Sequence, residues 1–346
     1  MKKVTLEQIA KELNLSKGIV SLAIRNKYGV NEETRSRVIL KALEMGYNFS
    51  YSPSKGSKNI ILVVKNMNVL NEEFWRNVIV GVERELSKNG FVFSILSLDS
   101  SADNSTFTID AFSRSANGII LLNQCPKEII ISIYKLGVPL VLLDMVSPVE
   151  GQIDQVMANN FEAGLQAVNH LIKKNHKKII IFGNPEYSVS FQQRYFGCVK
   201  ALERAKKSDN DIEYVILDKP QKIQSDDDVY ENDDLIICNP NDLRDLLKEN
   251  GDYSIVCLND VILRYTLRVL KELNLKVPDD ISLISFDNTS VSIDNNITSI
   301  NIDKIELGKQ ATKLLIGKIN DPRNIAITVE LSVSLIERNS VKDKRY

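Results

Sequence analysis

Four polar side chains of this chain follow or flank short apolar runs, where they could bind a small molecule. Asp144, Asn259 and Asp287 each stand at or just after the end of such a run. Their acceptor oxygens can orient hydroxyl groups or the N–H groups of a base. Arg194 falls near the start of an expected helix, where the helix dipole disfavours a cation, so its guanidinium suits the hydroxyls or the carboxylate of a ligand in a cleft. Catalytic and metal-binding sets are missing around them, which predicts binding and not an enzyme.

An aromatic pair, Phe74 and Trp75, stands close to the end of the first apolar run. The only tryptophan of the chain offers a flat face for a sugar or base ring, although packing beneath a helix is the alternative. Two other candidates have alternatives as well. Arg194 could instead pair with Glu186 at the surface, and Asp287 could cap the following turn.

These side chains need a frame of alternating strands and helices. Apolar runs of strand length occur twice in series, separated by amphipathic helical patterns; they cover residues 60–64, 91–96, 118–122 and 140–143, and then 179–182, 214–217, 235–238, 255–258 and 281–286. This rhythm predicts an α/β protein with two doubly wound parallel sheets. Ligands of such sheets bind at the carboxyl ends of the strands, so we expect the site between the two lobes. Asn259 would contact the ligand there, whereas Asp260 either contacts it or caps the next helix.

The first sixty residues have a different pattern. Thr5 and Gln8 have the spacing of a capping box, and Ser16 can cap a second helix after a two-residue turn. Two short helices joined so tightly predict a helix-turn-helix, whose second helix can enter the major groove of DNA. Asn31 can cap a third helix that stops at Gly46.

The exposed face of the second helix carries the candidate DNA contacts. Lys17 can reach guanine edges, while Ser16 and Ser21 suit phosphate oxygens. The full predicted set is Thr5, Ser16, Lys17, Gly18, Ser21, Arg25, Asn26 and Tyr28. Residues 1–58 hold 11 Lys and Arg against 5 Asp and Glu, and the rest of the chain holds 33 against 40. A basic amino-terminal module on an acidic body is typical of a phosphate-binding module joined to a ligand sensor.

Several ordered segments resemble the LacI/GalR family of bacterial transcription regulators. They are residues 5–10 (TLEQIA), 15–21 (LSKGIVS), 26–30 (NKYGV), 33–38 (ETRSRV), 258–260 (LND) and 277–288 (VPDDISLISFDN). The resemblance implies a helix-turn-helix module followed by a two-lobed periplasmic-binding-protein-like domain. It also implies ligand contacts from Arg194 and from an aromatic residue after the first strand, here Phe74 or Trp75.

The resemblance also implies the domain bounds. Residues 1–58 would form the DNA-binding domain and linker, and residues 59–340 the effector-binding domain. The chain would cross between the lobes near 158, 290 and 320, giving one lobe of 59–158 plus 291–320 and another of 159–290 plus 321–340.

Three departures from the family pattern concern function. Leu22 stands where the family usually has a contacting arginine, and Met145 stands where an arginine commonly follows Asp144. The linker 47–58 contains Pro53 and Gly56 and lacks the Ala-Arg-x-x-Leu pattern of the hinge helix that wedges a leucine into the minor groove. We therefore predict a weak or absent hinge helix.

Composition limits the remaining classes. The four cysteines Cys125, Cys198, Cys238 and Cys257 have no C-x-x-C spacing, which favours free thiols in a reducing cytoplasm over disulfides or zinc. Neither a secretory signal nor a membrane span is expected, and no cofactor or metal is predicted.

The sequence therefore predicts a cytoplasmic transcription regulator, a repressor that binds double-stranded operator DNA under the control of a small-molecule effector. Two-fold symmetry would supply a second half-site, and the charged tail lacks a leucine heptad, so a homodimer is expected. A sugar or sugar phosphate is the expected effector, and a nucleobase-type ligand would also suit the site. The competing hypotheses are a two-lobed ligand-binding protein without effective DNA recognition, a transport-type binding protein, and an enzyme on a Rossmann-like sheet.

Overall fold

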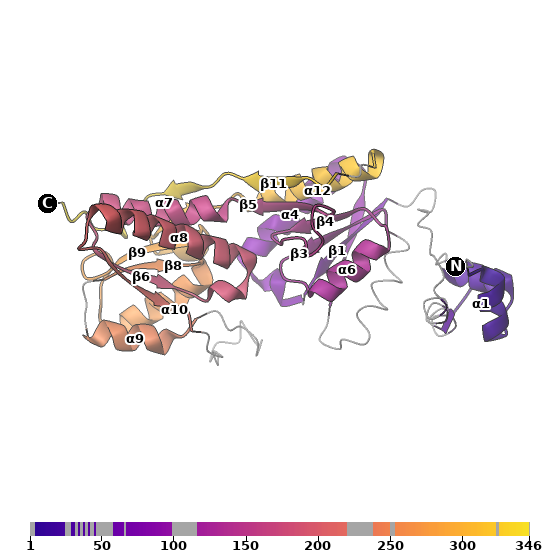
Figure 1. Cartoon of the computed structure of the whole chain (residues 1–346), viewed down its shortest axis with the longest axis horizontal. Helices are drawn as coiled ribbons and strands as arrows, with labels where there is room; N and C mark the ends of the chain where they lie inside the picture. The colour runs from indigo at the N-terminus through magenta and orange to yellow at the C-terminus, as the bar shows by residue number, and fades with distance from the viewer. Residues whose placement is uncertain are drawn as a thin grey trace.

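A computed structural model gives the architecture. It describes residues 4–24, 29–31, 34, 37–38, 41, 45, 58–65, 67–98, 116–219, 238–249, 253–322 and 325–345. Two six-stranded sheets, each covered by helices, form two lobes that follow the amino-terminal helices along the chain (Figure 1). The predicted DNA contacts Arg25, Asn26 and Tyr28, the linker 47–57 and most of the predicted strand 235–238 lie outside the described residues.

The amino-terminal helices form the predicted helix-turn-helix. They are α1 (Leu6–Leu13) and α2 (Lys17–Ile24). The Thr5 hydroxyl accepts from the Gln8 amide while the Gln8 side chain accepts from the Thr5 amide, so the capping box is confirmed. The Ile19 amide donates to Ser16 Oγ over 3.1 Å, and the Thr34 amide donates to Asn31 Oδ1 over 2.8 Å. Both predicted caps are therefore present.

The first lobe contains the sheet β2-β1-β3-β4-β5-β11, in which every pair is parallel. Its strands are β1 (Asn59–Val64), β2 (Val92–Ser97), β3 (Gly118–Leu122), β4 (Leu140–Leu143), β5 (Asp154–Ala158) and β11 (Thr328–Leu331). The 3-10 helix η1 (Met67–Asn71) and the helices α4 (Glu73–Lys88), α6 (Lys127–Lys135) and α12 (Lys304–Asn320) complete it.

Alternate residues of β1 show why its sequence is apolar throughout. Ile60, Leu62 and Val64 pack in the core beneath α4 and α12, whereas Ile61 and Val63 pack in the core beneath α6. A strand covered on both faces cannot alternate apolar with polar residues, because both faces leave water.

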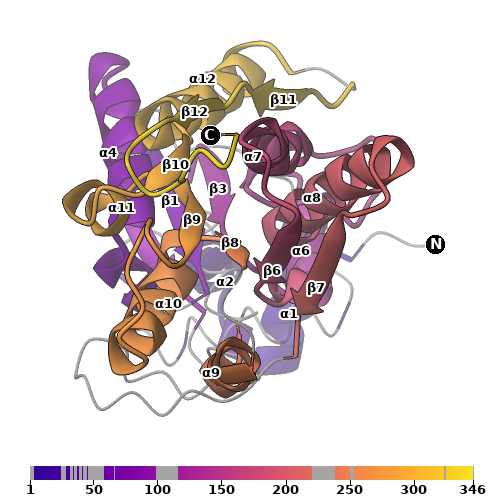
Figure 2. The ribbon, with the colours of Figure 1, turned by 90° about the vertical axis from the view of Figure 1, so that its left-hand side faces the viewer.

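The second lobe contains the sheet β7-β6-β8-β9-β10-β12, parallel except for the pair β10 and β12. Its strands are β6 (Lys178–Phe182), β7 (Glu213–Leu217), β8 (Ser254–Cys257), β9 (Ser282–Asp287), β10 (Thr298–Asn301) and β12 (Ser334–Ile336). Its helices are α7 (Asn160–Lys173), η2 (Pro185–Tyr187), α8 (Val189–Ser208), α9 (Pro240–Glu249), α10 (Asp260–Glu272) and α11 (Ser290–Asp294). Figure 2 looks at the molecule from the end at which this lobe lies in Figure 1.

The strand pairing corrects two of the three predicted crossings. β10, at 298–301, pairs with β9 in the second sheet, so residues 291–301 do not belong to the first lobe. β11, at 328–331, pairs with β5 in the first sheet, so residues 321–331 do not belong to the second lobe. The chain crosses after β5, as predicted near 158, and then at about 302 and 332. The expectation near 290 and 320 was wrong because it divided the chain without knowing which strands pair.

Within the described residues, no helix is both long enough and apolar enough to cross a membrane. All four cysteines are free thiols, and burial raises the pKa of Cys125, Cys198 and Cys257 to about 12. Such thiols stay protonated and unreactive at neutral pH.

Candidate functional site

The carboxyl ends of strands from both lobes surround one cleft. Its walls include all six residues predicted to contact an effector, namely Phe74, Trp75, Asp144, Arg194, Asn259 and Asp287. The first lobe supplies the turns after β1, β3 and β4, and the second lobe supplies those after β6, β8 and β9. The structure therefore brings together residues separated by more than 200 positions in the sequence.

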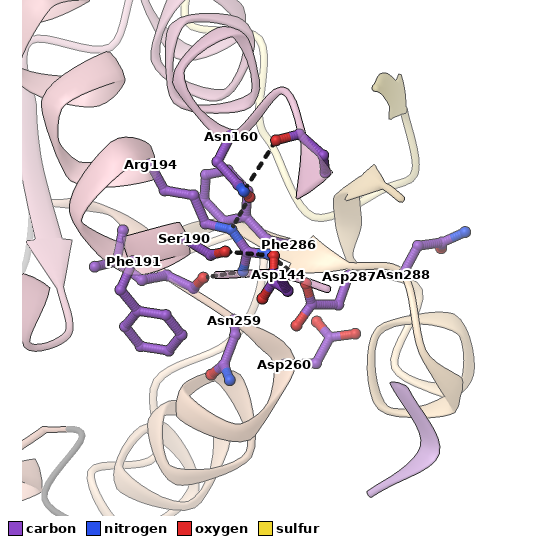
Figure 3. A network of polar contacts seen from close by, with 12 residues as sticks. Asp144, Asn160, Ser190, Phe191, Arg194, Asn259, Asp260, Phe286, Asp287 and Asn288 are labelled. Atoms are coloured by element: carbon purple, nitrogen blue, oxygen red, sulfur yellow. Dashed lines mark hydrogen bonds and ion pairs between the residues drawn. The ribbon is translucent and has the colours of Figure 1, made fainter. Parts of the chain in front are cut away.

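Arg194 is at the centre of the second lobe's wall (Figure 3). Its side chain is buried, and its guanidinium donates to three acceptors: Nε to Asn160 Oδ1 at 2.9 Å, Nη1 to the Leu258 carbonyl at 2.7 Å and Nη2 to Asp287 Oδ1 at 2.8 Å. The expected alternative, a surface pair with Glu186, is not what the structure shows. Arg194 therefore connects α7, α8, β8 and β9, and in this structure its guanidinium donates to protein acceptors.

Asp287 has a backbone suited to its position at the strand end. Its φ of 87° and the φ of 49° at Asn288 are left-handed, and they turn the chain sharply after β9. One carboxylate oxygen accepts from Arg194, while the other has no hydrogen-bond partner among the described residues. That second oxygen leaves an acceptor available at the cleft.

The sequence left open whether Asp260 contacts the ligand or caps the next helix, and the structure shows which residue is the cap. Asn259 is the residue that caps α10, because its Oδ1 accepts from the Ile262 amide at 2.9 Å. Asp260 instead accepts from Ser285 Oγ, from the amide and hydroxyl of Thr289, and from Ser292 Oγ. Burial and the charge of Asp287 raise the pKa of Asp260 to about 6 despite these donors.

Contacts between the lobes close the cleft. Ser190 Oγ, on α8, donates to Asp144 Oδ1 over 2.6 Å, and burial raises the pKa of Asp144. The Ser290 amide, at the start of α11, donates to the Glu73 carboxylate at 3.0 Å. Gln124 also donates to the Tyr187 carbonyl. Each of these bonds joins a first-lobe group to a second-lobe group, so the two walls of the cleft are held together in this structure.

The aromatic pair on α4 combines the two expected roles, contact with a ligand and packing beneath a helix. Trp75 is buried and packs with the first-lobe core, yet it also lines the cleft. The Phe74 ring lies edge-on to it with centroids 4.8 Å apart. Tyr187 and Phe191 add a second aromatic pair from the opposite lobe, with centroids 5.0 Å apart.

Sequence reasoning missed several lining residues, above all Glu72 and Glu73. Glu72 stands at the N-cap position of α4 but makes no capping hydrogen bond. Burial, with the charge of Asp287, raises the pKa of its carboxyl to about 7. The only sequence feature that pointed to Glu72 and Glu73 was their position directly before Phe74 and Trp75.

The candidate DNA contacts on the described residues are mostly exposed. Ser16, Lys17 and Gly18 are exposed and Ser21 is half-buried. Lys17 Nζ lies 2.6 Å from Glu7 Oε1 of the first helix, which lowers the pKa of Glu7. Leu22, at the departure from the family pattern, is 37% exposed and not part of the small core of this module. Thr5 is exposed and acts as the cap of α1.

Comparisons with known proteins agree with this arrangement. A family model for a periplasmic binding protein-like domain matches residues 168–341. The PurR repressor of Mannheimia succiniciproducens is 25% identical over 350 residues, covering 98% of each chain. The CytR repressor of Escherichia coli K12 is 27% identical over 324 residues, covering 91% of this chain and 89% of that protein.

Two solved structures have the same fold over nearly the whole chain. A complex of the transcriptional regulator CelR with cellobiose has a TM-score of 0.69 at 23% identity, covering 98% of this chain and all of that one. A lac repressor dimer bound to operator has a TM-score of 0.65 at 20% identity, covering 99% of this chain and all of that one. The relatives named here are regulators and not enzymes. The chain belongs to the LacI/GalR family, with a periplasmic-binding-protein-like domain that includes residues 168–341.

Proposed function

We propose that this protein is a DNA-binding transcription regulator, a repressor, whose hold on operator DNA is set by a small molecule in the cleft. The observation that carries the proposal is the presence in one chain of a basic helix-turn-helix and a two-lobed cleft whose walls meet through hydrogen bonds between lobes. We place it in the cytoplasm, where its DNA target lies.

The lobes provide the means of control. An effector that contacts both walls would favour the closed state over an open one, in proportion to the difference in its affinity for the two. In a homodimer, which we propose because one helix-turn-helix makes few contacts, closure would change the spacing of the two DNA-binding modules.

A sugar remains our expected type of effector. The CelR structure holds cellobiose, and a LacI-family structure from Enterococcus faecium holds ribose; its TM-score with this chain is 0.67 at 21% identity. The cleft here combines acceptor oxygens with aromatic faces, a combination that suits hydroxyl groups on an apolar ring.

Binding to DNA would use the exposed face of α2. Lys17 would exchange its bond to Glu7 for a base edge or phosphate, and Ser16 and Ser21 would donate to phosphates. The exposed side chain of Leu22 cannot donate a hydrogen bond, but it can contact a thymine methyl group.

To test DNA binding, duplexes that the full chain binds are selected from a random pool. The full chain is then titrated against the most enriched duplex. With about 6 phosphate contacts per dimer, affinity should fall by roughly a thousandfold between about 50 and about 200 mM salt. Lys17→Gln should weaken binding at least threefold, whereas Lys88→Gln, which changes an exposed lysine of α4, should not. No enrichment of any sequence would favour the alternative of a ligand-binding protein without DNA recognition.

A further inference from the structure

The charged side chains of the cleft differ in how many hydrogen-bond and ion-pair partners they have. Among the described residues, two cations line it and Lys304 lies beside it, and each of the three has a protein partner. Arg194 donates to three acceptors, Lys304 Nζ donates to the Asn288 carbonyl at 3.2 Å, and Arg264 has a partner of its own. An anionic ligand would therefore share each of these positive charges with a protein partner, and it would lie close to the carboxylates of Asp144, Asp260 and Asp287.

The carboxylates are also engaged, with one exception. Asp144, Asp260 and Glu73 accept from hydroxyl or amide donors, and Asp287 is paired with Arg194. Glu72 lines the same cleft, is half-buried, and has no hydrogen-bond or ion-pair partner for its side chain in the described part of the chain. A partly buried carboxylate without a partner costs free energy that a cation would recover.

The surroundings of Glu72 favour a cation further. Phe74 and Trp75 follow it on α4, and Tyr187 faces it from the second lobe. The faces of aromatic rings attract ammonium groups, and they do so more strongly in a site shielded from water.

We infer that the effector carries an ammonium group that pairs with Glu72, and that phosphorylated forms of the same molecule are excluded from the cleft. This inference rests on the proposed function, because it assigns the charge of the molecule that the cleft would hold. It narrows the expected effector from a sugar or sugar phosphate to a hydroxylated amine, of which an amino sugar is the simplest kind.

The test uses sets of related compounds that carry an ammonium group, no charge or a phosphate. Glucosamine, glucose and glucose 6-phosphate form one set, and 5′-amino-5′-deoxyadenosine, adenosine and adenosine monophosphate form another. Binding to the full chain is measured by calorimetry and by the fluorescence of Trp75, the only tryptophan of the chain. The ammonium compound of at least one set should bind ten times or more tighter than both of its relatives.

Glu72→Gln should remove this preference, while Glu83→Gln, on the same helix and bonded to Ser87, should leave it intact. The inference is overturned if a neutral or phosphorylated member binds as tightly as the amine, or if Glu72→Gln keeps the preference. It also fails if no member of either set binds. The operator assay is run without any effector and again with the compounds of both sets, so it decides separately whether the regulatory proposal survives.

Discussion

Arg194 connects the cleft to the stability of the second lobe. A buried guanidinium that donates to an amide, a carbonyl and a carboxylate holds three separate elements at the distances given above. It also lies over the Phe286 ring, 5.1 Å from the centroid. Because the same side chain lines the cleft and joins these elements, its roles in folding and binding cannot be separated by removing it alone.

Arg194→Met should destabilise the second lobe by roughly 3–5 kcal/mol, because it leaves Asp287 buried without its partner. Denaturant unfolding followed by circular dichroism measures the change. Arg204→Met on the exposed side of the same helix serves as the control and should cost less than about 0.5 kcal/mol. Equal stability of the two variants would show that the three hydrogen bonds contribute little.

Glu72 predicts a dependence of stability on pH. Its pKa rises from an ordinary 4.5 to about 7 on folding, so the folded state binds the proton more tightly and loses stability as pH rises from about 4.5 to about 7. Glu72→Gln should therefore raise the free energy of unfolding at pH 8 by about 1–3 kcal/mol, and the gain should vanish near pH 4.5. Thermal unfolding across this range tests it, with Glu83→Gln as a control that should show no such trend. A gain that is constant with pH would contradict the assigned cause.

At the scale of elements, glycines set how closely the helices of each lobe approach. A Cβ added at Gly164 of α7 would lie 2.1 Å from the Arg194 carbonyl oxygen of α8, and one at Gly197 would lie 2.1 Å from the Phe161 carbonyl oxygen. The first lobe repeats the arrangement, since a Cβ at Gly308 of α12 would lie 2.0 Å from the Val78 carbonyl oxygen of α4. Backbone touches backbone at both contacts, so there is no flexible side chain to give way.

Gly164→Ala and Gly308→Ala should each destabilise the protein by about 1–3 kcal/mol or more, because the helices must separate. Gly164→Ala should also displace Arg194 and weaken ligand binding. Gly18→Ala is the matched exchange at an open helical position, where the nearest atom lies 3.7 Å from the added Cβ. It should stabilise its module by up to about 1 kcal/mol. The melting temperatures of the three variants distinguish these outcomes.

At the scale of the whole molecule, hydrogen bonds between the lobes contribute to closure. The pairs Ser190 with Asp144 and Ser290 with Glu73 each join a hydroxyl or amide of the second lobe to a carboxylate of the first. Hydrogen bonds to charged groups contribute about 1.5–3 kcal/mol each. A balance of this size can be shifted by a bound effector, which a regulator requires.

Replacing both Ser190 and Glu73 by alanine should shift the protein without ligand toward the open state. Small-angle X-ray scattering should then report a larger radius of gyration than for the wild type. Ser87→Ala, which removes a hydroxyl bonded to Glu83 within α4, should leave the scattering unchanged. An unaltered radius in the double variant would mean that other contacts keep the lobes closed.

Local chemistry made much of this protein predictable from its sequence. The capping residues of α1 and α2, the apolar strands of the doubly wound sheets and the polar residues at their ends follow from periodicities of a few residues. The six predicted effector residues share one cleft because parallel strands of a sheet end at the same edge.

Only the tertiary structure decided which distant groups meet. It assigned β10 to the second sheet and β11 to the first, and chose Asp287 as the partner of Arg194. Among the residues that the structure describes, it left the Glu72 side chain without a partner. The Arg194–Asp287 pair spans 93 positions and the contact between Gln155 and Thr328 spans 173. Such pairings depend on how the whole chain packs, and no local periodicity records them. The positions of the binding groups could thus be inferred from the sequence, while the charge that the cleft leaves unsatisfied had to be found in the fold.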